Sequence, residues 1–197
     1  EVLSLFGVLI QQYVQRDLLL ERLQTANRQL EAYSFTDPLT GLPNRRSIIA
    51  ELGRLFSLAS RQGRSVLIAF IDLDGFKQIN DSHGHEVGDE FLIEIGRRLS
   101  GGLRASDLLG RLGGDEFVLI GLGPLVDNQQ EDATAAVRGR LAPLIQGRFV
   151  MEQCAIDYAG ASFGIVCVDP ERYTPDQALK EADAAMYQDK RARKRQA

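Results

Sequence analysis

The stretch Arg111-Leu112-Gly113-Gly114-Asp115-Glu116-Phe117 lies between two apolar runs, residues 108–109 before it and residues 117–120 after it. Two consecutive glycines between such runs predict a tight β-hairpin, because a two-residue primed turn needs a positive φ at both central positions. We therefore expect Asp115 and Glu116 at the hairpin tip, where glycines let a polyanionic ligand approach the backbone closely. On this stretch alone, an ordinary hairpin with acidic residues facing water is the simpler interpretation.

The composition is typical of a globular protein, with 44% apolar and 25% charged residues among 197. This length suits one domain of ordinary size with an appendage, and we expect the boundary between residues 1–34 and 35–197. The net charge of -4 provides no general field for nucleic acid, so we expect no nucleic-acid partner. An anionic ligand would need a metal ion or a local group of Lys and Arg.

The cysteines and the hydropathy indicate a location. Cys154 and Cys167 do not make a disulfide framework, and they fit a reducing compartment. The apolar run at residues 2–10 is too short to span a bilayer and lacks the basic start of a signal peptide. The chain opens on Glu1 and not on Met, so we expect a piece of a longer protein, and the cysteine usage favours a cytoplasmic location. We expect that this piece does not itself insert into a membrane. The alternative that the full-length protein is attached to a membrane stays open.

Residues 1–34 are predicted to form one long helix with a heptad repeat. Eight of its ten core positions are apolar, which favours a coiled coil and hence a homodimer through this helix. Gln12 and Arg16 interrupt the apolar seam in its middle. The alternative is a single amphipathic helix that packs on a domain outside this sequence. In both cases the helix would carry a signal into the domain that follows.

Turn residues and apolar periodicity indicate the remaining elements. Predicted helices cover about residues 45–61, 76–81, 128–146 and 175–190, and another opens within residues 82–89 and ends near 99. Asn44 is the expected cap of the first, which should bury Ile48, Ile49, Leu52, Leu55 and Phe56. Predicted strands cover residues 66–71, the two hairpin arms, 148–156 and 161–168, the last two joined by a turn near Gly160. This order predicts an α/β (α+β) sandwich whose central, mainly antiparallel sheet is flanked by helices.

A second acidic element follows the predicted central strand. Asp72 comes just after its end, and open α/β sheets place ligands there. If this strand lies beside the hairpin, Asp72 and Asp115 converge. Carboxylates with few competing His or Cys residues suit Mg²⁺ or Mn²⁺, and the Leu73 carbonyl could add a ligand. The alternative for Asp72 and Asp74 is a pair of turn and helix-cap residues.

His83 and His85 do not make a convincing zinc site, because no third ligand is evident. A polar contact at a nucleotide site, or a simple structural role in the loop, is the preferred interpretation for both side chains.

These motifs together resemble the GGDEF domain, the catalytic module of bacterial diguanylate cyclases. The resemblance covers residues 37–194, nearly all of the globular part, and its motifs are long, ordered and correctly spaced. It rests on four groups of residues: Asp37-Pro38-Leu39-Thr40-Gly41-Leu42 with Asn44-Arg45-Arg46; Asp72-Leu73-Asp74-Gly75-Phe76-Lys77 with Asn80-Asp81; Gly84-His85 with Gly88-Asp89; and Gly113-Gly114-Asp115-Glu116-Phe117. The fold it implies is that of nucleotidyl cyclases and of the polymerase palm.

The resemblance implies that each domain binds one GTP and that two domains condense two GTP into cyclic di-GMP and two pyrophosphates. Each implied role falls on matching positions. Guanine would be read by Asn80 and Asp89, with a further substrate contact from His85. Metal ligands would be Asp72, the Leu73 carbonyl, Asp115 and Glu116. The 3′-hydroxyl proton would pass to Asp115 or Glu116, with Asp115 favoured. Phosphates would meet Lys77, the backbone near Phe76, and Lys190.

Two further positions concern regulation and a departure from the family pattern. Arg104 and Asp107 match the RxxD motif of the family's inhibitory cyclic di-GMP site; the alternative is a surface ion pair. A second arginine, from the predicted helix over about residues 128–146 (the third helix in the family pattern), completes that site, and either Arg138 or Arg140 fits. The family usually ends its last helix with a glycine and then an arginine. Here Arg193 and Lys194 stand at those positions, so the charge is kept without the arginine geometry.

The leading interpretation is therefore an active, product-inhibited diguanylate cyclase that is regulated through its N-terminal helix. One alternative is a non-enzymatic receptor for GTP or cyclic di-GMP. Another is a dimerisation module with a vestigial nucleotide site. A third is a cyclase that makes an adenine-containing dinucleotide, against which Asn80 and Asp89 argue.

Overall fold

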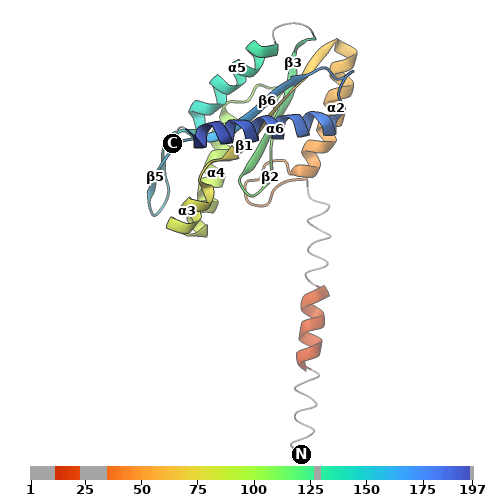
Figure 1. The fold of residues 1–197 in the computed structure, drawn as a ribbon. Coiled ribbons are helices and arrows are strands. Elements are labelled where there is room, and N and C mark those ends of the chain that lie inside the picture. Colours follow the sequence, from red (N-terminus) through yellow and green to blue (C-terminus); the bar gives the residue numbers. More distant parts are fainter. Residues whose placement is uncertain (1–11, 23–34, 127–129, 196–197) are drawn as a thin grey trace, which may run out of the picture. The chain divides into compact units, whose positions relative to one another are not determined.

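The structure is a computed structural model that describes residues 12–22, 35–126 and 130–195 (Figure 1). The chain divides into two compact units, Glu1–Phe35 and Thr36–Ala197. In the first unit residues 12–22 are helical, and the rest of the predicted helix over residues 1–34 lies outside the described residues. Within the described ranges, no helix is both long and apolar enough to cross a bilayer.

The second unit is built on a four-stranded sheet with β1 at its centre. The sheet order is β2-β3-β1-β6, and every neighbouring pair is antiparallel. Its strands are β1 (Arg64–Leu73), β2 (Leu108–Gly113), β3 (Glu116–Leu125) and β6 (Ala161–Val168). All but the first residue of β1 are buried, as a continuous apolar run in a central strand predicts. The predicted central strand is confirmed, and it is longer than its apolar run.

Two layers of helices cover the two faces of this sheet (Figure 1). Alternate β1 side chains point to opposite faces, so the strand contributes to two separate apolar clusters. One face is covered by α2 (Arg45–Gln62) and α6 (Pro175–Lys194), and the other by α4 (His85–Gly101), α5 (Gln130–Leu141) and the short helix η1 (Ala142–Ile145). Helix α3 (Phe76–His83) packs against α4. This arrangement confirms the predicted sandwich with a mainly antiparallel sheet.

The predicted hairpin forms, but its turn lies one residue further along the chain than predicted. Gly113 pairs with Glu116 across the ladder, so the two connecting residues are Gly114 and Asp115. Gly113 and Gly114 have φ values of 136° and 51°, and a register shift separates Arg111 from Gly113. The extra residue forms a bulge that only a glycine-rich tip accommodates easily. Asp115 therefore stands in the loop itself.

The segment between α5 and β6 differs from its prediction. Residues 148–156 are not one strand: β4 (Gly147–Val150) and β5 (Ala155–Tyr158) form their own two-stranded sheet, closed by a bond from Met151 N to Cys154 O of 2.8 Å. The third helix ends at Leu141 and continues as the 3₁₀ turn η1, because Pro143 cannot donate to an α-helical ladder.

Two details of the other helices also differ from expectation. Ile49 was predicted to face inward with the core residues of α2, yet it is 46% exposed. It lines a groove between α2 and α6. Helix α6 ends at Lys194, four residues later than predicted, because its last turn makes polar contacts that periodicity does not reveal.

Candidate functional site

The acidic residues meet at the end of β1. Asp72 is in register with Glu116 on β3 and with Ser162 on β6, and it is only 7% exposed. The next residue donates its backbone N–H to Asp115 O over 3.2 Å, which ties the hairpin tip to the end of the central strand. The predicted convergence of Asp72 and Asp115 therefore has a structural basis: adjacent antiparallel strands place a strand end beside a hairpin tip.

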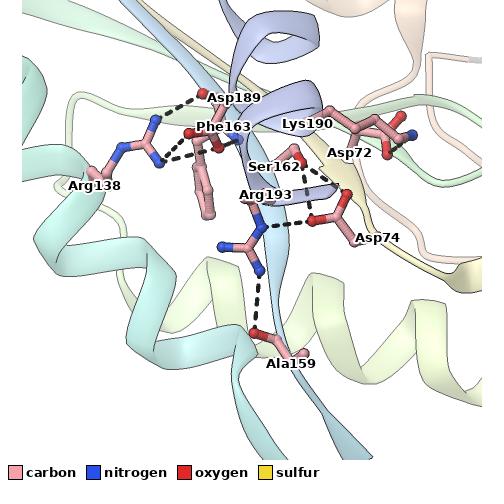
Figure 2. Close-up of polar contacts among 9 residues, drawn as sticks. All are labelled: Asp72, Asp74, Arg138, Ala159, Ser162, Phe163, Asp189, Lys190 and Arg193. Carbon is pink, nitrogen blue, oxygen red and sulfur yellow. Dashed lines mark hydrogen bonds and ion pairs between the residues drawn. The ribbon is translucent and has the colours of Figure 1, made fainter. Parts of the chain in front are cut away.

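A lysine from the last helix completes this acidic edge. Lys190 Nζ lies 2.5 Å from Asp72 Oδ1 (Figure 2). Burial alone would lower the pKa of Lys190, but the hydrogen bond to Asp72 and the charges of Asp72 and Asp115 raise it overall. Burial raises the pKa of Asp115, and the neighbouring Asp72 charge raises it further, against the effect of Lys190 and Arg111. The edge therefore combines two mutually repelling carboxylates with a cation.

Glu116 faces a different part of this edge. Its carboxylate lies 3.9 Å from Arg45 and lines the groove between α2 and α6 together with Asp183. Burial raises the pKa of Glu116, while the Arg45 charge opposes the shift. Because Asp115 stands in the turn and Glu116 stands in the strand, their side chains have different surroundings although they are neighbours in sequence.

The donor set at this edge fits a hard divalent cation that is completed by a ligand. Within the part of the chain that the structure describes, no group of three or more His, Cys, Asp or Glu side chains is arranged to hold a metal ion. Asp72 is nevertheless close enough to Asp115 for its charge to raise the pKa of the Asp115 carboxyl. Mg²⁺ typically binds through one or two carboxylates and takes phosphate oxygens or waters for its remaining positions. The oxygen-only chemistry of this pair is that of such a site.

The predicted nucleoside contacts lie on α3 and α4. Lys77 is exposed on the first turn of α3, whose N-cap is Gly75 and whose first N–H groups receive no side-chain cap. His85 and Asp89 are exposed on α4, and Asn80 is half-buried between the two helices. Asp74 does not cap α3, because the N-cap of that helix is Gly75 and no side chain caps it. The Asp74 carboxylate instead accepts from Ser162.

A glycine explains how Asn80 reaches α4. A Cβ atom placed on Gly88 would lie 1.8 Å from Asn80 Oδ1, so the carboxamide occupies the space that any other residue would fill. Asp89 follows Gly88 directly on α4, so the side chain of Asn80, which extends from α3, lies close to Asp89.

Arg111 braces the hairpin tip and was not singled out from the sequence. Its guanidinium lies 2.9 Å from Asp37 Oδ1 and donates to Gly114 O over 2.7 Å. Asp37 also accepts from Thr40 N and Thr40 Oγ1. Burial raises the pKa of Asp37, but the bonds from Thr40 and Arg111 lower it overall. The sequence signal that could have indicated this role is the position of Arg111 two residues before the glycine pair.

The predicted product-site residues form a turn before β2. Arg104 N donates to Asp107 Oδ2 over 2.9 Å, and the Arg104 side chain is exposed. Of the two third-helix arginines, the structure brings Arg140 to this turn, with its Nη2 3.0 Å from Asp107 Oδ2. Arg138 points instead to α6, where it contacts Asp189 at 3.2 Å. Figure 2 shows Arg138 in this second position.

The basic residues at the end of α6 also differ in their contacts. Lys190 reaches Asp72, whereas Lys194 is exposed. Arg193, which was noted only as a departure from a family pattern, lies 2.9 Å from Asp74. The contacts of Ser162, Asp189 and Arg193 were not predicted, because all three bridge segments that are distant in sequence.

The sequence profile of the family described as "Diguanylate cyclase, GGDEF domain" matches residues 34–196. The chain belongs to the GGDEF family. This GGDEF domain is 48% identical over 191 residues to the diguanylate cyclase DgcP of Escherichia coli, covering 97% of the chain and 54% of DgcP. It is 38% identical over 162 residues to the response regulator PleD of Caulobacter vibrioides, covering 79% of the chain and 34% of PleD. The chain thus spans about half or less of these curated relatives.

Solved structures confirm the fold of the GGDEF domain. A sensory box/GGDEF family protein from Caulobacter crescentus matches with a TM-score of 0.74 and 32% identity, over 81% of this chain and 99% of that one. The diguanylate cyclase SiaD of Pseudomonas aeruginosa, solved with its activator SiaC, matches with a TM-score of 0.71 and 34% identity, over 96% of this chain and 70% of SiaD. Diguanylate cyclases of this family need a divalent metal ion, which agrees with the acidic edge at Asp72 and Asp115.

Proposed function

We propose that this GGDEF domain condenses two molecules of GTP into cyclic di-GMP. The observation that carries the proposal is the joining of Asp72, Asp115 and Lys190 at one edge, through the Leu73–Asp115 backbone bond and the Asp72–Lys190 ion pair. Two carboxylates and an ammonium group at one edge suit a polyphosphate that arrives with a divalent cation. The similarity to DgcP supports the same activity.

In this proposal each domain presents one GTP to the other within a dimer. The 3′-hydroxyl oxygen of one GTP forms a bond to the α-phosphorus of the second, and the bond from that phosphorus to pyrophosphate breaks. The reciprocal step closes the ring and releases the second pyrophosphate. Asp115 takes the hydroxyl proton as the general base. Each domain needs a second domain for the reaction, because one domain binds only one of the two GTP molecules.

The metal ion, Mg²⁺ or Mn²⁺, would be held by Asp72, Asp115 and the Leu73 carbonyl. Glu116, the further ligand that the family resemblance implies, would have to turn from the groove beside Arg45 to join them. When bound it would neutralise charge on the attacking and leaving oxygens. Lys190 and Lys77 would hold the phosphates, and the uncapped N–H groups at the start of α3, near Phe76, would add backbone donors. Lys194 is exposed and could reach phosphate only from the helix end.

Base selection would fall to Asn80 and Asp89, with His85 nearby. A carboxylate at Asp89 accepts from N1 and N2 of guanine, and adenine has no such pair of donors. A polar group left unpaired in a closed site is strongly disfavoured, which is how such pockets discriminate. We expect GTP, and not ATP, to be the substrate.

The experiment incubates the purified chain with GTP and Mg²⁺ and separates the products by chromatography. Wild type should yield cyclic di-GMP, and Asp115→Asn should yield none. Asp132→Asn, which removes an exposed carboxylate from α5, is the matched control and should keep full activity. GTP binding without product at high protein concentration would favour the receptor interpretation instead.

Product inhibition would act through Arg104 and Asp107, with Arg140 as the third-helix arginine that the geometry favours over Arg138. The guanidinium group of arginine can form two hydrogen bonds to a phosphate and can stack on the face of a guanine ring. Added cyclic di-GMP should inhibit wild type, and Arg104→Ala should relieve that inhibition while Arg54→Ala, an exposed change on α2, should not. Equal inhibition of all three proteins would rule out this site.

A further inference from the structure

The last turns of α6 are held in place without apolar burial. Met186 is the last residue of this helix that belongs to the core, and residues 187–195 are all exposed or half-buried. Helix ends that bury no apolar side chain fray readily. Lys190 stands in this unburied part, and lysine has a long, flexible side chain. Its position on Asp72 therefore needs another source of order.

Polar contacts on both sides of Lys190 supply that order. On one side, Arg193 Nε lies 2.9 Å from Asp74 Oδ2, and Arg193 Nη2 lies 3.4 Å from Ala159 O. Asp74 also accepts from Ser162 Oγ over 2.8 Å. The Arg193 contact therefore joins the helix end to the segment after β1 and to the turn before β6, as Figure 2 shows.

On the other side, Asp189 joins the helix to β6 and α5. Its carboxylate accepts from Phe163 N over 2.8 Å and from Arg138 Nη1 over 3.2 Å. Arg138 also donates to Phe163 O over 2.8 Å, so the same strand residue meets both partners. Asp189 and Arg193 are four residues apart and lie on one face of the helix, with Lys190 between them along the chain.

The Asp74–Arg193 contact adds to the close approach of α6 to the sheet. Gly164 on β6 lets the helix backbone come so near that a Cβ there would lie 1.9 Å from Ala182 O. This glycine sets the position of the helix up to Met186, and the polar contacts set its position beyond.

We propose that Arg193 and Asp189 are positioning residues that hold Lys190 at the acidic edge for contact with the substrate triphosphate. The inference rests on the proposed function, because the anion that Lys190 meets is taken to be GTP. Arg193 stands where the family resemblance expects glycine, so this chain supplies a contact that the family pattern lacks. Arg193 acts through Lys190 and does not itself touch the substrate.

The test measures binding of two probes in the presence of Mg²⁺: guanosine, and the α,β-methylene analogue of GTP, which cannot be cleaved at the reacting bond. Arg193→Gln should weaken binding of the GTP analogue about tenfold and leave guanosine unchanged, because a charge-assisted phosphate contact is lost. Arg191→Gln, an exposed change of the same charge on the same turn, is the control and should bind both probes as wild type does.

A double-mutant cycle separates positioning from a general structural effect. In a Lys190→Ala background, Arg193→Gln should cause no further loss, because the contact through which it acts is gone. Arg193→Lys should recover part of the affinity, and Asp189→Asn should repeat the selective loss as a second variant.

Several results would overturn the inference. These are unchanged binding of the GTP analogue in both Arg193→Gln and Asp189→Asn, equal loss of guanosine binding, or additive losses with Lys190→Ala. If wild type itself binds neither probe, the proposed function fails, and this outcome is distinct from failure of the positioning role alone.

Discussion

Asn80 occupies space on α4 that only a glycine leaves free, so one missing side chain determines where the proposed base-reading group stands. The overlap that a Cβ on Gly88 would make is with the end of the Asn80 side chain, 1.8 Å from its Oδ1. A flexible side chain can rotate away from such an overlap at a modest cost in stability. The consequence of filling the space is therefore expected in binding more than in folding.

We predict that Gly88→Ala displaces Asn80 and raises the KM for GTP about tenfold, as expected for loss of a hydrogen-bonded base contact. Steady-state kinetics with GTP measure this change. Thermal unfolding should shift little, because alanine has the higher helix propensity and partly offsets the overlap. An unchanged KM with a large drop in unfolding temperature would contradict this account.

Glu94 provides a pH-dependent contribution to stability. Its carboxylate lies 2.6 Å from Arg97 and 2.8 Å from Arg98. The hydrogen bond from Arg97, against the effect of burial, and then the bond from Arg98 lower the pKa of Glu94 from 4.5 to about 2. A carboxyl whose pKa is lower in the folded state stabilises the fold fully above its unfolded pKa. That stabilisation is lost as the pH falls through the folded pKa.

We therefore predict that Glu94→Gln lowers the free energy of unfolding near neutral pH. The difference from wild type should narrow as the pH falls from 4.5 toward 2. Urea unfolding at several pH values measures both proteins. Glu51→Gln, which removes the partner of Arg54 on α2, should show a much smaller pH-dependent difference, since that pair is 3.5 Å apart and largely exposed. A constant Glu94 difference across this range would be inconsistent with the ion pairs.

At the scale of elements, the contact between β6 and α6 depends on Gly164. An added methyl group would lie 1.9 Å from Ala182 O and 2.2 Å from Met186 N, and backbone atoms in a packed helix cannot move aside locally. We predict that Gly164→Ala lowers the free energy of unfolding by about 3 kcal/mol or more, as severe overpacking does.

Gly139 on α5 is the matched control for that change. Among the described residues, no atom lies within 4 Å of a Cβ placed there apart from its chain neighbours and the backbone of its own helix, so alanine meets open space. Gly139→Ala should stabilise the domain by ~0.5–1 kcal/mol. Denaturant unfolding of both variants tests the pair, and similar values for the two would show that the close β6–α6 approach is not rigid.

The start of α6 is held by a capping box. Thr174 Oγ1 accepts from Gln177 N over 3.3 Å, and Gln177 Oε1 accepts from Thr174 N over 2.9 Å. We predict that Thr174→Ala costs about 1 kcal/mol of stability. Thr134→Ala, inside α5, should instead be neutral or slightly stabilising, because alanine is the better helix former. Equal losses in both variants would indicate a general effect of threonine removal.

At the scale of the whole molecule, the two compact units predict separable roles. Unit Thr36–Ala197 contains both apolar clusters and all of the sheet, so it should fold alone. We predict that removal of residues 1–34 leaves its unfolding midpoint unchanged. Specific activity should then fall on dilution more steeply than in the full chain, because two domains must meet for reaction. Equal specific activity of the two proteins across a dilution series would show that the N-terminal helix does not promote pairing.

Local sequence was sufficient for most of the architecture and for the identity of the acidic groups. The buried strand β1, the capped helix after Asn44 and the glycine-rich hairpin follow from periodicity, capping and turn chemistry over a few residues. Asp72 and Asp115 were recognisable because one follows the apolar run of the central strand and the other follows the glycine pair of the hairpin. The break of the predicted 148–156 strand into a separate small sheet was not recognisable, since apolar pattern alone does not reveal which strand each segment pairs with.

Only the tertiary structure decided which charged groups meet. Arg140 and Arg138 are two residues apart on α5, yet one reaches Asp107 and the other reaches Asp189. Asp74 meets Arg193, 119 residues away in sequence, and Arg111 meets Asp37, 74 residues away. Turn and helix signals act over a few residues, so they determine the elements. Long-range ion pairs depend on how these elements pack, and packing is a property of the complete sheet and its two helical layers.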